Sequence, residues 1–206
     1  MKNFNKILKK GIISDNPVLI QVIGICSALA VTNLAMNSLI MGLALTFTTA
    51  LSSFIISSLK DLTPKHIRMV AQVFIISFFV IIVDLFLKAY MHDMSKTLGP
   101  YVGLIITNCI IMGRAEAYAI SNKPLDSLVD GFAAGIGYTL VLLSIAIIRE
   151  LLGFGTIFGL KVMPEGFVKW TLMVMPPGAF FILPIIMWLA HNALNKKSTG
   201  KEGGRK

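Results

Sequence analysis

The chain contains two cysteines, and each lies the same distance after a proline in an uncharged segment. Pro17 precedes Cys26 by nine residues, and Pro100 precedes Cys109 by nine residues. A proline suits the first turn of a helix, because its missing N–H would have no partner there. At a rise of about 1.5 Å per residue, each thiol would lie ~13 Å from the start of its helix. We therefore predict two thiols near the middle of a hydrocarbon layer of about 30 Å.

The number of cysteines limits the chemistry that these thiols could perform. A disulfide would need their α-carbons within about 7 Å, and inert cysteines would simply be small buried hydrophobes. Zinc needs about four ligands, and the three histidines, His66, His92 and His191, lie at the ends of the predicted spans. An iron–sulfur cluster usually needs about four thiolates. If this chain binds such a cluster, a partner chain must supply the other ligands.

The composition is that of an integral membrane protein made of helices. Of the 206 residues, 55% are hydrophobic and only 14% are charged, whereas soluble domains average about 25% charged residues. The net charge of +9 comes largely from lysines and arginines near the two termini. Basic tails beside membrane helices are typical of the cytoplasmic side, where they face anionic membrane lipid. We therefore predict no nucleic-acid partner.

The uncharged runs predict six transmembrane helices in a single all-α membrane domain, residues 1–206. Residues 17–59 lack Asp, Glu, Lys, Arg and His and are long enough for two spans, with a polar turn near 33–38. The other four spans are predicted at about 66–90, around Cys109, at 126–149 and at 170–191. The basic segments 1–15 and 193–206 are predicted to be cytoplasmic tails, because 14 of the 19 basic residues then lie inside.

Six spans divide into two halves of three, residues 17–91 and 97–192. An odd number of spans per half forces the halves into opposite orientations, and the Pro-to-Cys spacing begins each half. Short or broken helices at matching positions of inverted repeats are the best pointer to a site at the midplane. We therefore predict two inverted three-helix repeats, each with a short or broken first helix that carries a cysteine.

Three motifs resemble a known family of membrane subunits. Residues 24–32 read GICSALAVT, residues 102–117 read VGLIITNCIIMGRAEA, and residues 149–153 read RELLG. They resemble the D-subunit family of the bacterial sodium-translocating NADH:quinone reductases, and the similarity runs from about Asn16 to Trp188. A related alternative is the E-subunit family of the Rnf ferredoxin:NAD oxidoreductases, in which a proline tends to follow the first cysteine; here Ser27 follows. A small transporter with inert cysteines is the alternative from another class.

The resemblance implies a role in electron transfer. In the family, the cysteines that match Cys26 and Cys109 bind the iron of a [2Fe–2S] cluster together with two cysteines of the E subunit, an inverted relative. The A, B, C and F subunits of the complex carry FMN, FAD, riboflavin and the NADH site. Electrons pass from NADH to quinone and sodium is exported. This implies a multi-pass subunit of the bacterial inner membrane that is not active alone, with both termini cytoplasmic.

Two carboxylates are candidates for a sodium path. Asp84 lies inside the third predicted span, where a carboxylate is costly and is by default a functional hypothesis. Lys88 is one turn further on, and an i,i+4 ion pair is the alternative explanation. Asp130 begins the stretch DGFAAGIG within the fifth span, where it could be an acidic entrance that gathers cations or a helix N-cap.

Other charged and small residues are predicted to have structural roles. Arg114 could anchor its helix end or raise the potential of a cluster. Arg149 and Glu150 are predicted to form a pair at the membrane interface. The glycines 131, 135 and 137 predict a face on which another helix packs closely.

Overall fold

The computed structural model describes residues 21, 23–64, 66–90, 92–153, 155–157, 160–161 and 175–202 of the 206-residue chain, and these residues are almost entirely helical. Pro17 and the residues before it lie outside the described part, so the predicted start of the first helix does too. The elements are α2 (Ile25–Val31), α3 (Ala35–Leu59), α4 (Arg68–Tyr90), α5 (His92–Ile106), α6 (Cys109–Arg114), the π-helix η2 (Ala115–Ala119), α7 (Pro124–Gly153), the strands β1 (Thr156–Ile157) and β2 (Leu160–Lys161), and α9 (Pro176–Glu202). The two strands form a short antiparallel pair.

Four helical segments among the described residues are long and apolar enough to cross a membrane. They are Ala35–Leu59, Arg68–Tyr90, Lys96–Ala119 and Pro124–Gly153. The apolar part of α9, Pro177–Leu189, is shorter, and α2 has seven residues. The chain is therefore a helical membrane protein, and four of the six predicted spans have a counterpart of full length in the part that the structure describes.

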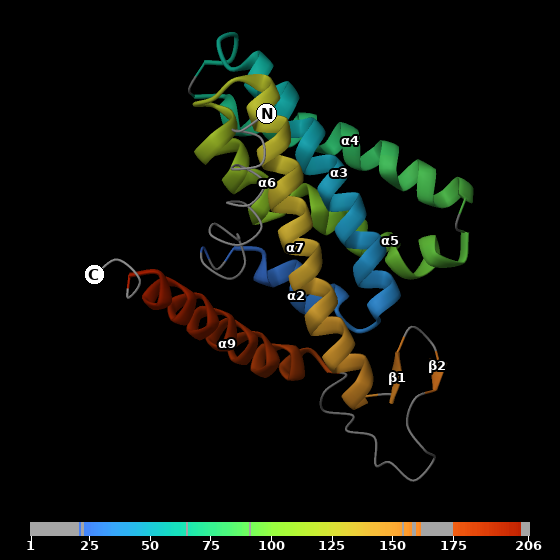
Figure 1. Ribbon diagram of the computed structural model, residues 1–206. Coiled ribbons are helices and arrows are strands. Elements are labelled where there is room, and N and C mark those ends of the chain that lie inside the picture. Colours follow the sequence, from blue (N-terminus) through green and yellow to red (C-terminus); the bar gives the residue numbers. More distant parts are fainter. Residues whose placement is uncertain are drawn as a thin grey trace.

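The centre of the molecule is an antiparallel pair of helices, α3 and α7 (Figure 1). A Cβ built on Gly135 would lie 2.6 Å from the α-carbon of Thr46, and one built on Gly131 would lie 2.9 Å from the carbonyl oxygen of Thr49. No larger side chain fits at these positions unless the helices move apart. The predicted small-residue face is confirmed for these two glycines, and it lets the two backbones approach closely.

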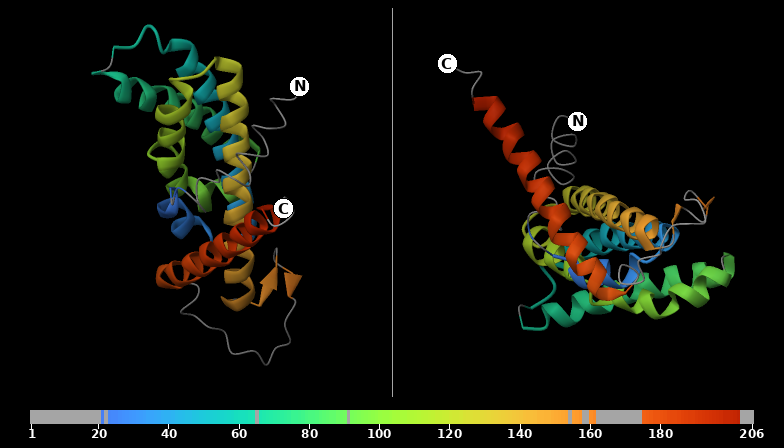
Figure 2. Two further views of the ribbon diagram at one scale, coloured as in Figure 1. Left: turned by 60° about the vertical axis from the view of Figure 1, so that its left-hand side comes forward. Right: turned by 90° about the horizontal axis from the view of Figure 1, so that it is seen from below.

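The remaining helices flank this central pair on two sides. In Figure 2, α4 and α5 lie together on one side of α3 and α7, and α9 crosses on another. Large apolar side chains of α4 are exposed, as expected of a helix that faces hydrocarbon: Val70, Phe74, Phe78, Ile81 and Leu85. Helix α9 continues to Glu202, so it includes most of the segment that we predicted to be a basic tail.

The predicted helix start at Pro100 is wrong. Helix α5 begins at His92, and Pro100 lies inside it with its side chain exposed. The polar residues before Pro100 extend the helix and do not form a boundary. A proline inside a helix removes one backbone hydrogen bond, but membrane helices tolerate it. The break that matters comes later, at Thr107 and Asn108, between α5 and α6.

Candidate metal centre at two helix starts

The two cysteines lie side by side although 83 positions separate them in the sequence. Cys26 is the second residue of α2 and Cys109 is the first residue of α6. Their sulfur atoms are 3.8 Å apart, both thiols are free, and both side chains are exposed at the surface of the chain. The expected break next to the second cysteine is present, and it brings the start of α6 against the start of α2.

Both sulfurs lie at helix N-termini, not in the middle of continuous helices as the proline spacing implied. The unpaired N–H groups at a helix start carry partial positive charge. This environment favours negative charge on a nearby sulfur, and a thiolate is the form that binds metal. Two helix starts that converge on one pair of sulfurs therefore suit an anionic thiolate site.

The spacing of the sulfurs fits two ligands of one tetrahedral metal ion. Two thiolates at about 2.3 Å from such an ion lie ~3.8 Å apart, which is the edge of the tetrahedron. Within the described residues, no group of three or more His, Cys, Asp and Glu side chains could hold a metal ion. The described part of this chain thus offers two of the four ligands that a thiolate cluster needs, and it offers them at an exposed surface.

A buried polar network lies directly behind the thiols. Asn108 donates from Nδ2 to Ser27 Oγ at 3.1 Å, and the Ser27 and Tyr138 hydroxyls are 2.5 Å apart. All three side chains are buried, with at most 2% of each residue exposed. Sequence reasoning assigned no role to these residues. The available signal was position, since Ser27 follows Cys26 and Asn108 precedes Cys109.

Gly24 allows the close approach of the two helix starts. Its φ is 88°, in the left-handed region that glycine adopts at no steric cost. A Cβ built on it would meet the side chain of Ile110 in α6 and would lie 3.3 Å from the Tyr138 ring. The residue that precedes α2 therefore needs both the conformation and the small size of glycine.

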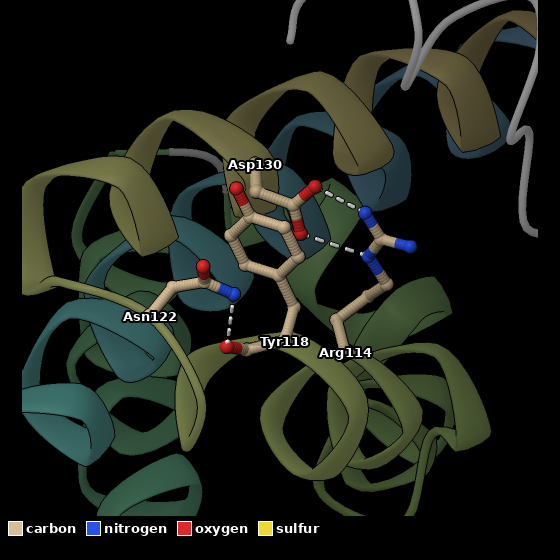
Figure 3. A network of polar contacts seen from close by, with 4 residues as sticks. All are labelled: Arg114, Tyr118, Asn122 and Asp130. Atoms are coloured by element: carbon tan, nitrogen blue, oxygen red, sulfur yellow. Dashed lines mark hydrogen bonds and ion pairs between the residues drawn. The ribbon is translucent and has the colours of Figure 1, made fainter.

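A buried ion pair joins α6 to α7. Arg114 donates from Nε to Asp130 Oδ2 at 2.9 Å and from Nη2 to the other carboxylate oxygen, as Figure 3 shows. The guanidinium also lies over the ring of Tyr118, 5.7 Å from its centroid. Asp130 lies inside α7, which begins at Pro124, so the N-cap explanation is wrong. Arg114 anchors its helix end through this pair, as one of the two predictions for it stated.

Asp84 has the partner that its sequence spacing suggested. Lys88 Nζ lies 2.6 Å from Asp84 Oδ2, one turn along α4. Both side chains are partly exposed, and an i,i+4 pair of this kind is a local contact along one face of the helix. The ion-pair explanation is confirmed, and it leaves a role in ion transport as a prediction.

The comparisons with known proteins agree with the predicted class of membrane protein. A family model described as "Rnf-Nqr subunit, membrane protein" matches residues 4–187, which is most of the chain. The chain belongs to the Rnf-Nqr family. The resemblance expected from its motifs is thereby confirmed at the level of the family.

Similar Rnf-Nqr proteins share one name, that of the D subunit of a Na(+)-translocating NADH-quinone reductase. The protein from Chlamydia abortus is 49% identical over 194 residues, which cover 89% of this chain and 91% of that protein. The protein from Chlamydia trachomatis serovar L2 is 50% identical, with 86% and 88% covered. The protein from Aeromonas hydrophila is 47% identical, with 89% and 90% covered. These relatives are subunits of an enzyme complex, and this chain matches them over nearly their full length.

The RELLG motif of this Rnf-Nqr chain has a structural role that the sequence did not reveal. Arg149 and Glu150 are each 1% exposed and lie within the core of the chain near the end of α7. Arg149 donates to Thr32 Oγ1 at 2.7 Å, and Glu150 accepts from the backbone N–H of Ala35 at 2.9 Å. The motif therefore ties the end of α7 to the turn between α2 and α3.

Proposed function

We propose that this Rnf-Nqr chain is the D-type membrane subunit of a sodium-translocating NADH:quinone oxidoreductase. In this proposal Cys26 and Cys109 supply two of the four thiolates of a [2Fe–2S] cluster, and an inverted partner, the E subunit, supplies the other two. The single observation that carries the proposal is the exposed thiol pair, with its sulfurs 3.8 Å apart. The names of the similar proteins favour this complex over the Rnf alternative.

The position of the thiols supports a shared site. Two exposed thiolates cannot complete a four-thiolate cluster, so the remaining ligands must come from a chain that packs against this surface. A related subunit in the opposite orientation would present a matching pair. We propose that this chain has six spans in two inverted three-helix repeats, with both termini in the cytoplasm. This topology would allow such a partner to bind about a pseudo-twofold axis.

The residues of this chain would hold and surround the cluster. The two thiolates would bind iron, the two helix starts would favour the negative charge of the site, and the partner would cover the exposed side. When bound, the cluster would accept and donate single electrons near the membrane midplane. The electrons would come from NADH and pass to quinone through FMN, FAD and riboflavin in the A, B, C and F subunits. This subunit alone would have no activity.

We propose that Asp130 is a stronger candidate than Asp84 for a residue that interacts with sodium during transport. Asp130 is 4% exposed and lies on the central helix α7, whereas Asp84 lies on the outer helix α4 and pairs with Lys88. A buried carboxylate on a central helix can interact with a cation that crosses the protein. The ion pair between Arg114 and Asp130 would then have to open as the cation passes.

Replacement of either cysteine tests the proposed function. In the complete complex, Cys26→Ala and Cys109→Ala should each abolish the cluster signal in electron paramagnetic resonance and lower NADH-driven quinone reduction by about a hundredfold or more, because loss of a metal ligand removes the electron carrier. Ser144→Ala is the matched control, since Ser144 is an exposed polar residue of α7 that bonds only to the Leu140 carbonyl among the contacts described.

The control should retain the iron content and the activity of the wild-type complex. A cysteine variant with full iron and full quinone reduction would exclude the mechanism. Such a result would favour the alternative in which the chain is a small transporter or structural subunit with inert thiols.

A further inference from the structure

We infer that a buried polar bridge, made by Ser27, Asn108 and Tyr138, positions the two cysteine sulfurs. The inference rests on the proposed role of these sulfurs as cluster ligands. The cysteine side chains are exposed, so packing on that side within this chain does not hold them. Their spacing must be set by the backbone beneath them, and the bridge joins the two backbones where each cysteine is attached.

Ser27 is the centre of the bridge. A serine hydroxyl has one donor and two acceptor positions, and all three are used here. The hydroxyl donates to the Gly24 carbonyl at 3.1 Å, accepts from Asn108 Nδ2 at 3.1 Å, and lies 2.5 Å from the Tyr138 hydroxyl. Because Ser27 donates its own proton to the Gly24 carbonyl, its hydroxyl oxygen accepts a hydrogen bond from the Tyr138 hydroxyl. One arrangement of hydrogen atoms therefore satisfies every bond.

Asn108 links the two helix starts. Its Oδ1 accepts from the backbone N–H of Ile110 at 3.0 Å and so caps α6. Its Nδ2 reaches Ser27 in α2. The Asn108 side chain thus caps the helix that begins at Cys109 and also hydrogen-bonds to Ser27, the residue after Cys26. A rotation of either helix start would move a sulfur and stretch this bond.

Tyr138 fixes the bridge to the core. It is fully buried in α7, the helix that packs against α3, and its ring lies against Gly24. The bridge therefore ties the position of both thiols to the central helix pair. Each of the three residues acts through the cysteines and not on the cluster itself, so they are positioning residues.

The test measures how well the thiols are preorganised without any cluster. The full-length chain, purified in detergent and reduced, is titrated with phenylarsine oxide. The reagent condenses with two thiols to give a dithioarsenite and one water, and it binds tightly only when both thiols are held close together. Cys26 and Cys109 are the two cysteines of the chain, so the reagent reports on this pair alone.

The most informative comparison is between adjacent residues of α7. Tyr138→Phe removes one hydroxyl from the bridge, and it should weaken binding of the arsenical about fivefold, as expected for one hydrogen bond. Thr139→Val removes the neighbouring hydroxyl, which bonds to Gly135 and to Thr46 in α3. This control should leave the affinity for the arsenical unchanged.

Ser27→Ala and Asn108→Ala extend the test if the tyrosine variant fails to fold. Equal affinities for wild type, Ser27→Ala and Asn108→Ala would overturn the inference, and so would equal losses in Tyr138→Phe and Thr139→Val. In the complete complex, the bridge variants should also shift the midpoint potential or the resonance spectrum of the cluster. A wild-type complex without a cluster would refute the proposed function, whereas the arsenical titration would still decide the role of the bridge.

Discussion

At the scale of single residues, the buried charged groups in the described part of this chain have partners within the protein. Arg114 and Asp130 are buried together between α6 and α7, and Glu150 caps the start of α3. Buried charges are costly unless they are paired and hydrogen-bonded. These residues therefore contribute to the assembly of the core, and any role of Asp130 in sodium transport would be added to a structural one.

Variants of the buried ion pair can separate the two roles. Arg114→Ala or Asp130→Ala should each lower the free energy of unfolding by about 3–5 kcal/mol, because each leaves the other charge buried without its partner. The double variant Arg114→Met with Asp130→Leu should recover most of this loss, since apolar residues of similar volume can replace a buried pair. Thermal unfolding in detergent measures both effects.

The double variant then tests the sodium proposal in the complete complex. If it is stable but no longer exports sodium while it still oxidises NADH, Asp130 takes part in ion transport. Normal sodium export by a stable double variant would remove Asp130 from the path.

At the scale of elements, two kinds of helix contact organise the molecule. Helices α3 and α7 pack through glycine and hydroxyl side chains, which let the backbones come close without a bulky core. Helices α2 and α6 are short, and their first turns meet where the two sulfurs lie 3.8 Å apart. Because α7 contacts both α3 and the bridge behind the thiols, it connects the packed centre to the candidate metal site.

Glycine substitutions distinguish the packed interface between α3 and α7 from the exposed surface of α5. Gly135→Ala should destabilise the protein by several kcal/mol, because the new Cβ would lie 2.6 Å from the Thr46 backbone. Gly103→Ala is the matched control in α5, where a Cβ meets nothing within 4 Å. Since alanine is a better helix former than glycine, this control should stabilise the chain by about 0.5–1 kcal/mol. Unfolding temperatures of the full-length chain measure both, and equal effects of the two substitutions would contradict the packing.

At the scale of the whole molecule, the candidate metal site is open on one side. Its two ligands lie at the surface of the chain, while the residues that hold them are buried. A complete four-thiolate site would need two more ligands, so this arrangement fits the proposal that a partner subunit supplies the other half. The exposed apolar side chains of α4 are consistent with lipid around that helix.

The open site predicts that the partner protects the thiols. In the isolated chain, a maleimide should label Cys26 and Cys109 readily, whereas in the complete complex both should be labelled at least about tenfold more slowly, because the partner and the cluster cover them. Mass spectrometry of labelled peptides measures the rates at each cysteine. Equal labelling in the two states would show that this surface is not the partner interface.

The sequence alone determined the class of protein and the number of cysteines that a metal site could use. Hydropathy and charge are summed along the chain, so uncharged runs predict membrane helices without knowledge of their packing. A count of two cysteines likewise limits the metal sites that the chain can complete. The motifs around these cysteines also placed the chain in its family, which the comparisons confirmed.

Only the tertiary structure decided how these parts meet. The sulfur contact and the bridge join residues that are 81 to 111 positions apart, and such contacts depend on how whole helices pack. For the same reason, the proline spacing misplaced the helix start at Pro100 and gave no sign that Ser27, Asn108 and Tyr138 would meet. Local patterns determine which segments become helices, whereas long-range packing determines which of their side chains share a site.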